Sequence, residues 1–187
     1  MSLNYSINFS IPKRSKKLIK FIIIHYTGMK SQSKAIERLC DSSSKVSAHY
    51  FIKDNGKLLN LVPDLYEAWH AGKSSWKNLK ALNKYSIGIE INNSGHDYGY
   101  PKFKKRQIST LKKLLKNLIN KYKIRNRNIL GHSDIAPDRK KDPGEKFPWK
   151  NLANKDLSIW HKLKENKIKI LRNQKLNSKD QNMFFKN

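Results

Sequence analysis

The apolar residues of this 187-residue chain occur in short runs whose spacing predicts alternating strands and helices. Residues 18–24 form an almost uninterrupted apolar run, which is typical of a central strand covered on both faces. Residues 85–91 alternate and predict a second strand, and residues 128–130 predict a short third one. Residues 48–62 indicate two strands joined by an Asn-Gly turn, because this dipeptide is the strongest short-range hairpin signal.

Two segments have helical spacing. Ile36 and Leu39 predict a short helix over residues 33–40, with Ser33 as its N-cap. A longer apolar stripe predicts a helix from about residue 104 to residue 123, and its members are Ile108, Leu111, Leu115, Leu118, Ile119 and Tyr122.

The remaining segments are predicted with less regular structure. Residues 69–83 are rich in Gly, Ser, Asn and Trp and have no period, so they are interpreted as a surface loop. A last helix is predicted from about residue 156 into the lysine-rich tail. Strands and helices that alternate around a hairpin favour an α/β fold with a mixed central β-sheet flanked by helices.

The length is that of one domain, large enough to bury a core without disulfides or a structural metal. We expect an N-terminal arm over residues 1–17, the domain over residues 18–160, and a basic C-terminal helix or tail over residues 161–187. Part of this tail is expected to be disordered, because chain ends are often poorly ordered.

The charge is extreme, with 40 Lys and Arg against 14 Asp and Glu and a net charge of +26. Such a charge attracts polyanions, which makes a polyanion-binding protein one hypothesis. The lysines are spread along the whole chain and do not alternate with aromatic residues along one groove, so specific nucleic-acid binding is not indicated. The high charge has two other interpretations. In the first, the lysines only solvate the surface; in the second, the charge attracts the protein to an anionic cell-wall or membrane polymer.

The single cysteine, Cys40, excludes an intramolecular disulfide and a zinc site built from several thiolates. The sequence has no apolar run long enough to cross a bilayer, and its first residues lack the pattern of a secretory signal peptide. These features predict a cytoplasmic protein, with the periplasm or cell envelope as the alternative if the start is mis-assigned. A monomer is the simplest expectation.

Three residues that bind zinc well stand beside the predicted strands. His25 follows the first apolar run, His132 follows residues 128–130, and Asp142 lies in a Pro- and Gly-rich loop over residues 137–148. Two imidazoles and one carboxylate suit a catalytic zinc ion, since a structural zinc usually has four protein ligands whereas a catalytic one keeps an open position. Ligands so distant in sequence meet only if the fold brings strand ends together.

Five ordered motifs carry a resemblance to a known family. They are Ile24-His25-Tyr26-Thr27, Ser47-Ala48-His49-Tyr50, Ala68-Trp69-His70-Ala71-Gly72, Ser86-Ile87-Gly88-Ile89-Glu90 and Gly131-His132-Ser133-Asp134-Ile135-Ala136-Pro137. Over about residues 8–149 the chain resembles the zinc-dependent N-acetylmuramoyl-L-alanine amidases of the type 2 amidase and peptidoglycan-recognition-protein fold. The resemblance implies Zn²⁺ ligation by His25, His132 and Asp142. It also implies cleavage of the amide between N-acetylmuramic acid and L-alanine in peptidoglycan or muropeptides.

Further residues have predicted roles. Glu90, at the end of its strand, is the expected general base and later the proton donor to the departing amine. Lys140 is expected to stabilise the negative oxygen of the tetrahedral intermediate, and the resemblance implies the same role. Trp69 and His70 are candidates for the substrate groove, with packing inside a loop as the alternative. His49 is interpreted as a structural or ligand-supporting histidine rather than a fourth ligand.

Two positions separate the chain from the phage-lysozyme branch of this fold. That branch has a cysteine as third ligand and a tyrosine before the histidine of the Ser-Ala-His motif, where this chain has Asp142 and Ala48. Non-catalytic members of this fold lack one or more ligands, whereas this chain has all three, so a module that binds muropeptides without cutting them is disfavoured and is kept as the second hypothesis. His96 and His161 carry no motif and are interpreted as surface residues. Both intact peptidoglycan and anhydro-muropeptides remain open as substrates.

Overall fold

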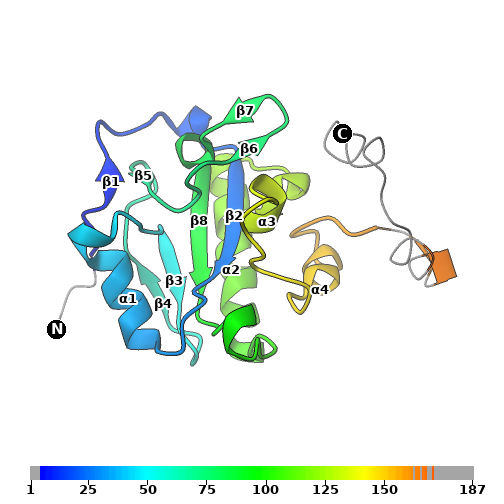
Figure 1. The fold of residues 1–187 in the computed structure, drawn as a ribbon. Coiled ribbons are helices and arrows are strands. Elements are labelled where there is room, and N and C mark those ends of the chain that lie inside the picture. The colour runs from blue at the N-terminus through cyan, green and yellow to red at the C-terminus, as the bar shows by residue number, and fades with distance from the viewer. Residues whose placement is uncertain (1–4, 162, 165, 168–169, 171–187) are drawn as a thin grey trace.

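The computed structural model describes residues 5–161, 163–164, 166–167 and 170. A five-stranded sheet with the strand order β4-β3-β8-β2-β9 forms its centre (Figure 1). Its strands are β2 (Phe21–Tyr26), β3 (Tyr50–Ile52), β4 (Leu58–Asn60), β8 (Ser86–Ile91) and β9 (Ile129–Gly131). Neighbouring strands run parallel except β4, which pairs antiparallel with β3. The predicted mixed sheet is therefore confirmed.

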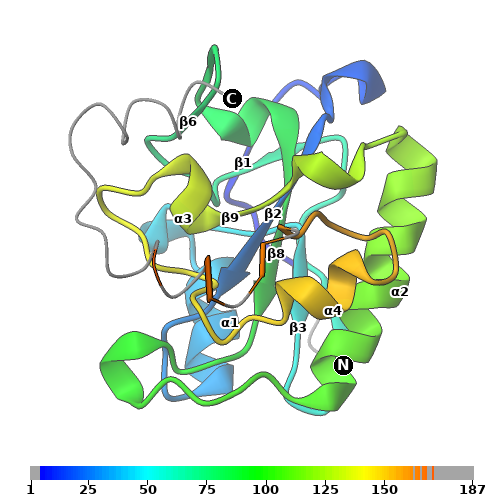
Figure 2. The same cartoon turned by 90° about the vertical axis from the view of Figure 1, so that its right-hand side faces the viewer.

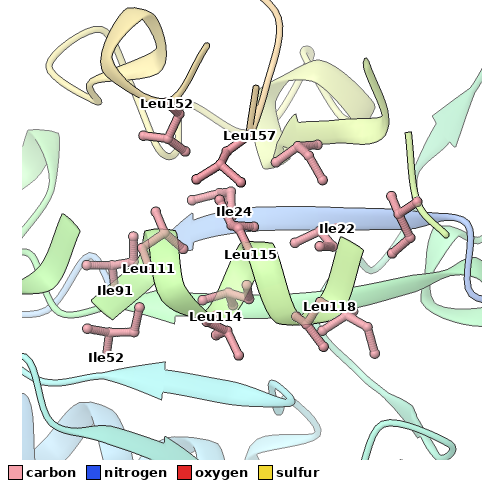
Figure 3. Packing of buried hydrophobic residues seen from close by; sticks show 14 of the residues in the cluster. Ile22, Ile24, Ile52, Ile91, Leu111, Leu114, Leu115, Leu118, Leu152 and Leu157 are labelled. Carbon is pink, nitrogen blue, oxygen red and sulfur yellow. The ribbon is translucent and has the colours of Figure 1, made fainter. Parts of the chain in front are cut away.

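Helices cover both faces of this sheet, as the two perpendicular views in Figures 1 and 2 show. The long helix α2 (Lys105–Tyr122) packs on one face, and α1 (Gln32–Cys40) and the one-turn α3 (His132–Ile135) pack on the other. Figure 3 shows Leu111 and Leu115 of α2 beside Ile24 of β2. No helix in the described part of the chain is long and apolar enough to cross a membrane.

The alternation of side chains along β2 and β8 separates the core from the polar residues. Ile22 and Ile24 of β2 face α2 together with the isoleucines of β8, whereas Phe21 and Ile23 face the opposite side. His25 is two residues after Ile23, so its side chain points to the same side as those of Phe21 and Ile23. It lies opposite Glu90 in the parallel pairing of β2 with β8. The ionisable residues of the two central strands are therefore neighbours on the face that carries α1 and α3.

Several predicted boundaries move in the structure. Residues Lys16–Leu18 form a 3-10 turn, so β2 begins only at Phe21. The N-cap of α1 is Ser31 rather than the predicted Ser33, since the Ser31 hydroxyl accepts the Lys34 N–H at 3.3 Å. The hairpin of β3 and β4 turns through Asn55 and Gly56 as predicted, with Gly56 at a φ of +85°.

Two predictions are wrong. The supposed loop over residues 69–83 contains a small hairpin of β6 (Ser75–Trp76) and β7 (Leu79–Lys80), and Trp76 packs against a buried cluster. The predicted last helix does not begin at residue 156, because Asp156 has a φ of 56°, which an α-helix does not accommodate. Residues 157–160 are not helical either, whereas residues 166, 167 and 170, further along the predicted segment, are helical. Instead α4 (Trp149–Ala153) precedes Asp156. Most of the expected basic tail lies outside the described residues.

The N-terminal segment packs against the domain. Here β1 (Phe9–Ser10) pairs with β5 (Glu67–Ala68), and the buried Asn8 side chain donates hydrogen bonds to the carbonyls of Asp41 and Val46, both at 2.8 Å. Remaining short elements are 3-10 turns at Ser42–Ser44, Leu82–Tyr85, His96–Tyr98 and Asn126–Asn128.

The buried carboxylate of Asp64 joins β3 to α2. It accepts hydrogen bonds from the hydroxyls of Tyr50 and Tyr122, both at 2.6 Å, and from Lys121 Nζ at 2.8 Å. Burial alone raises the pKa of Asp64, but these hydrogen bonds outweigh burial and hold the pKa below its usual value. The ionised carboxylate therefore stabilises the fold above the unfolded-state pKa, and this stabilisation is lost as the pH falls through the native pKa.

We expect Asp64→Asn to lower the free energy of unfolding at pH 7 by about 2 kcal/mol, because charge-assisted hydrogen bonds are lost. Urea unfolding at pH 7 and at acidic pH measures this difference, which should shrink as the pH falls. Asp138→Asn, at an exposed carboxylate, is the control. A difference between Asp64→Asn and the wild type that stays constant with pH would contradict the assigned role.

Candidate metal centre and active site

His25, His132 and Asp142 meet at one edge of the sheet. His25 lies near the carboxyl end of β2, and His132 directly follows β9, the parallel neighbour of β2. Asp142 arrives on the loop after α3, and its carbonyl accepts the Ser133 N–H at 2.8 Å. The fold thus brings together all three predicted ligands, which are separated by up to 117 residues in the sequence.

Local contacts explain how His132 and Asp142 reach this edge. The Asp134 carboxylate accepts the Gly131 N–H at 2.7 Å, which closes the turn that presents His132. A Cβ atom on Gly131 would stand 2.7 Å from Cδ of Pro143, closer than real Cβ contacts. Only glycine at position 131 therefore allows the loop of Asp142 to approach β9 so closely.

The three facing atoms form a compact triangle. Nδ1 of His25 and Nδ1 of His132 are 2.9 Å apart, and each lies 3.1 Å from Oδ2 of Asp142. All three side chains are buried. Ligand atoms bound to one zinc ion at about 2.0–2.1 Å in tetrahedral geometry are about 3.3 Å apart. The donor set and its spacing therefore fit a single metal ion with three protein ligands.

The charges of this triangle suit metal binding. Burial, and next the proximity of His132, lower the pKa of His25 to about 4, so its imidazole is neutral at pH 7. Asp142 supplies the carboxylate of the set, with Oδ2 3.1 Å from Nδ1 of each histidine. A neutral imidazole and an ionised carboxylate are the forms that bind metals.

Glu90 lies beside the triangle, and its carboxyl group has an oxygen without a hydrogen-bond partner and a raised pKa. Its Oε2 is the one buried side-chain oxygen without a hydrogen-bond partner in the described part of the chain. Burial raises the pKa of Glu90 to about 8, the charge of Asp142 adds to this shift, and Lys140 opposes it. A carboxyl with this pKa can gain and lose a proton near neutral pH, as a general acid and base must.

A cavity of about 560 Å³ opens over these residues. Glu90, Trp69, Lys140 and the three candidate ligands line it, and α1 contributes Arg38 to its wall. Trp69 is half-buried, and its Nε1–H donates to the Ser10 hydroxyl at 3.0 Å. The cavity therefore places the predicted acid-base residue, lysine and tryptophan around one space.

Of the two other predicted histidines, His70 lines this cavity, as predicted for the substrate groove, and His49 is not part of its lining. His70 is buried, and its Nδ1 is 3.0 Å from Nε2 of His25, so its ring is a direct neighbour of a candidate ligand. The ring of His49 accepts the Gly88 N–H at Nδ1, 3.0 Å away, and its Nε2 lies 3.0 Å from the Tyr66 carbonyl. His49 thus lies outside the triangle, as the sequence predicts.

His96 belongs to a cluster that the sequence analysis missed. It is half-buried rather than a plain surface residue, with Nδ1 2.8 Å from the Tyr26 hydroxyl and Nε2 3.0 Å from Glu145. Tyr100 stacks on its ring at 4.3 Å, and the Tyr100 hydroxyl donates to the Pro143 carbonyl at 2.5 Å. These contacts tie the loop before α2 to the loop of Asp142, a connection that no sequence motif indicates.

Comparison with known proteins places this geometry in a family. Residues 14–145 match the family described as N-acetylmuramoyl-L-alanine amidase. The chain belongs to this family. Among curated relatives, the N-acetylmuramoyl-L-alanine amidase AmiD of Escherichia coli K12 is 40% identical over 154 residues. This match covers 76% of the chain and 55% of AmiD, so the chain spans about half the length of that relative.

Two solved amidase structures share the fold. AmpDh3 of Pseudomonas aeruginosa, in complex with anhydromuramic pentapeptide, has a TM-score of 0.75 and 31% identity over 93% of this chain and 74% of AmpDh3. AmiD of E. coli, in complex with the substrate anhydro-N-acetylmuramic acid-L-Ala-D-γ-Glu-L-Lys, has a TM-score of 0.71 and 34% identity over 89% of this chain and 68% of AmiD. The amidase fold predicted from the motifs is therefore confirmed.

Proposed function

We propose that this amidase-family chain is a zinc-dependent hydrolase of the bond between N-acetylmuramic acid and L-alanine. One observation carries the proposal: the unpartnered carboxyl of Glu90 lies opposite His25, beside a complete triangle of metal ligands and at the wall of the same cavity. A module that only binds muropeptides has no use for a buried, proton-accepting carboxyl at this place.

His25 and His132 would hold the ion through Nδ1, and Asp142 would hold it through Oδ2. Zinc, when bound, supplies a Lewis acid that polarises the amide carbonyl and makes water more acidic. The protein contributes three ligands only, which leaves room for substrate and water.

Glu90 performs the proton transfers in this proposal. Its carboxylate takes a proton from the attacking water, and the resulting carboxylic acid gives that proton to the departing L-alanine nitrogen. An amine leaves easily and an amide anion does not, so this second transfer completes bond cleavage. The pKa of about 8 suits both directions of transfer.

Lys140 stabilises the negative oxygen that forms on the scissile carbonyl. It lines the same cavity as Glu90 and His25, and its charge lowers the pKa of both, which supports this role. Preorganised positive charge at such an oxygen is among the largest contributions to amide hydrolysis.

We expect Lys140→Met to lower kcat/KM by about 10²-fold, the effect typical of losing one oxyanion-stabilising group. Lys141→Met is the matched control, because Lys141 lines the same cavity but is exposed. Steady-state release of stem peptide measures both variants. Equal losses in the two variants would show that only the general positive charge of the cavity matters.

The proposed substrates are muropeptides or other peptidoglycan fragments. The ligand of the AmiD complex contains a γ-linked glutamate, whose α-carboxylate is free. Positive residues at the cavity, Arg38 among them, favour such an anionic stem peptide over a neutral one. We predict that the protein acts as a monomer, that it binds no specific nucleic acid, and that it works in the cytoplasm.

The decisive experiment is mass spectrometry of the purified protein incubated with anhydro-N-acetylmuramic acid-L-Ala-D-γ-Glu-L-Lys, with and without a chelator and zinc add-back. Release of free tripeptide that stops with the chelator and returns with zinc supports the proposal. An intact muropeptide in the presence of zinc-loaded protein would favour a binding module. Binding to nucleic acid with a steep salt dependence and no zinc requirement would favour the polyanion hypothesis.

A further inference from the structure

A chain of hydrogen bonds runs from Ser86 through His70 to His25, and in this chain each donor and acceptor is fixed. The Ser86 hydroxyl lies 2.6 Å from the Leu82 carbonyl, which can only accept, so the hydroxyl proton points to Leu82. The Ser86 oxygen is also 3.1 Å from Nε2 of His70. Since Ser86 has no second proton to offer, Nε2 of His70 must carry the proton and donate it.

The direction continues to the metal site. A neutral His70 with its proton on Nε2 has a lone pair on Nδ1, which lies 3.0 Å from Nε2 of His25. His25 must then donate from Nε2, which leaves the lone pair of its Nδ1 facing His132 and Asp142.

The residue after His70 does the same for the second histidine. Nε2 of His132 lies 3.2 Å from the Ala71 carbonyl, which again can only accept. His132 therefore carries its proton on Nε2, and the lone pair of Nδ1 faces the triangle. Two adjacent residues, one through its side chain and one through its backbone, thus act on both candidate ligands.

We propose that the dipeptide His70-Ala71 is a positioning element that presets the metal-binding tautomers of His25 and His132 before any ion arrives. The benefit of this element for catalysis rests on the proposed amidase function, whereas the predicted tautomers do not depend on that function. His70 touches neither substrate nor ion in this role, so it acts through His25.

The surroundings hold this dipeptide in place. Asn83 Oδ1 accepts the backbone N–H groups of both His70 and Ala71, at 3.1 and 2.7 Å. A Cβ atom on Gly88 would stand 2.3 Å from Cγ of His70, so glycine on β8 lets the ring lie against the strand. Such contacts from outside the ligand set orient metal-binding histidines and tune their affinity.

The test compares His70→Leu, which removes the acceptor for His25, with His70→Asn, whose side-chain oxygen can replace Nδ1. Long-range ¹⁵N–¹H NMR of the metal-free protein identifies which ring nitrogen of each histidine carries the proton. In the wild type we expect the proton on Nε2 of both His25 and His132. His70→Leu should change His25 and leave His132 unchanged, because the Ala71 carbonyl remains, so His132 is an internal control.

Zinc affinity, measured by competition with a chromogenic chelator, gives a second readout. We expect His70→Leu to weaken zinc binding about 10- to 100-fold and His70→Asn to restore part of it. If His70→Leu does not fold, Ser86→Ala tests the same chain, with Ser86→Thr as its hydroxyl-retaining control.

Two outcomes would overturn the inference: a proton on Nδ1 of His25 in the metal-free wild type, or unchanged tautomers and zinc affinity in a folded His70→Leu or Ser86→Ala variant. A protein with the expected tautomers and zinc affinity that fails to release tripeptide would instead overturn the proposed function alone.

Discussion

Replacing His25 or Asp142 with alanine is expected to abolish both zinc binding and amide hydrolysis while the protein stays folded. Each residue supplies one of three atoms that lie within 3.1 Å of one another, so two remaining donors hold an ion poorly. Metal polarisation is worth several kcal/mol, and each 1.4 kcal/mol is tenfold in rate, so the loss should be about 10³-fold or more.

The fold should survive these changes, because neither side chain belongs to the apolar clusters around α1, α2 and α3. Metal analysis by plasma mass spectrometry, tripeptide release and far-UV circular dichroism measure the three properties separately. His161→Ala, at an exposed histidine away from the cavity, is the control. Full activity in a zinc-free, folded His25→Ala or Asp142→Ala protein would refute the metal-dependent mechanism.

The second large effect, a loss of catalytic rate, is expected from Glu90→Gln. Glutamine keeps the shape of the side chain but cannot take a proton from water, so kcat should fall about 10²- to 10⁴-fold while zinc stays bound. Glu37→Gln, at an exposed carboxylate on α1, is the matched control. An unchanged kcat in Glu90→Gln would remove this residue from the mechanism.

The same substitution has an effect on stability in the metal-free protein. The native pKa of Glu90, about 8, lies above the ordinary value of 4.5, so the folded state prefers the neutral carboxyl. Its contribution to stability is complete below the unfolded-state pKa and is lost as the pH rises through the native pKa. Glu90→Gln should therefore show a higher Tm than the wild type at pH 8, and little difference at pH 4.

Sequence patterns predicted the parts that depend on local periodicity. Three patterns were sufficient to predict the sheet and its main helix, namely the apolar run of β2, the Asn55-Gly56 hairpin and the apolar stripe of α2. The meeting of His25 and His132 was also predictable, because residues at the ends of parallel strands gather at one edge of a sheet, whereas the prediction of Asp142 depended on the family resemblance. Their placement in the structure agrees with that prediction, and their chemical roles remain proposals.

Features set by tertiary contacts were not predictable. The 69–83 segment has no period because its order comes from Asn83, which holds the backbone of His70 and Ala71. His96 gains its partners only when two loops meet, and the left-handed conformation of Asp156 has no signal in its neighbours. In each case the controlling contact joins residues that local sequence does not relate.

The alternation along β8 also helps select the correct strand alignment during folding. The first four residues of β2 are apolar on both faces and would by themselves tolerate a shift of one residue, but this shift would turn His25 toward α2. In β8 the same shift would turn Glu90 toward the leucines of α2 and expose isoleucines in the cavity. The ionisable residues of β2 and β8 therefore protect the sheet against misalignment, and an apolar replacement of Glu90 would weaken that protection.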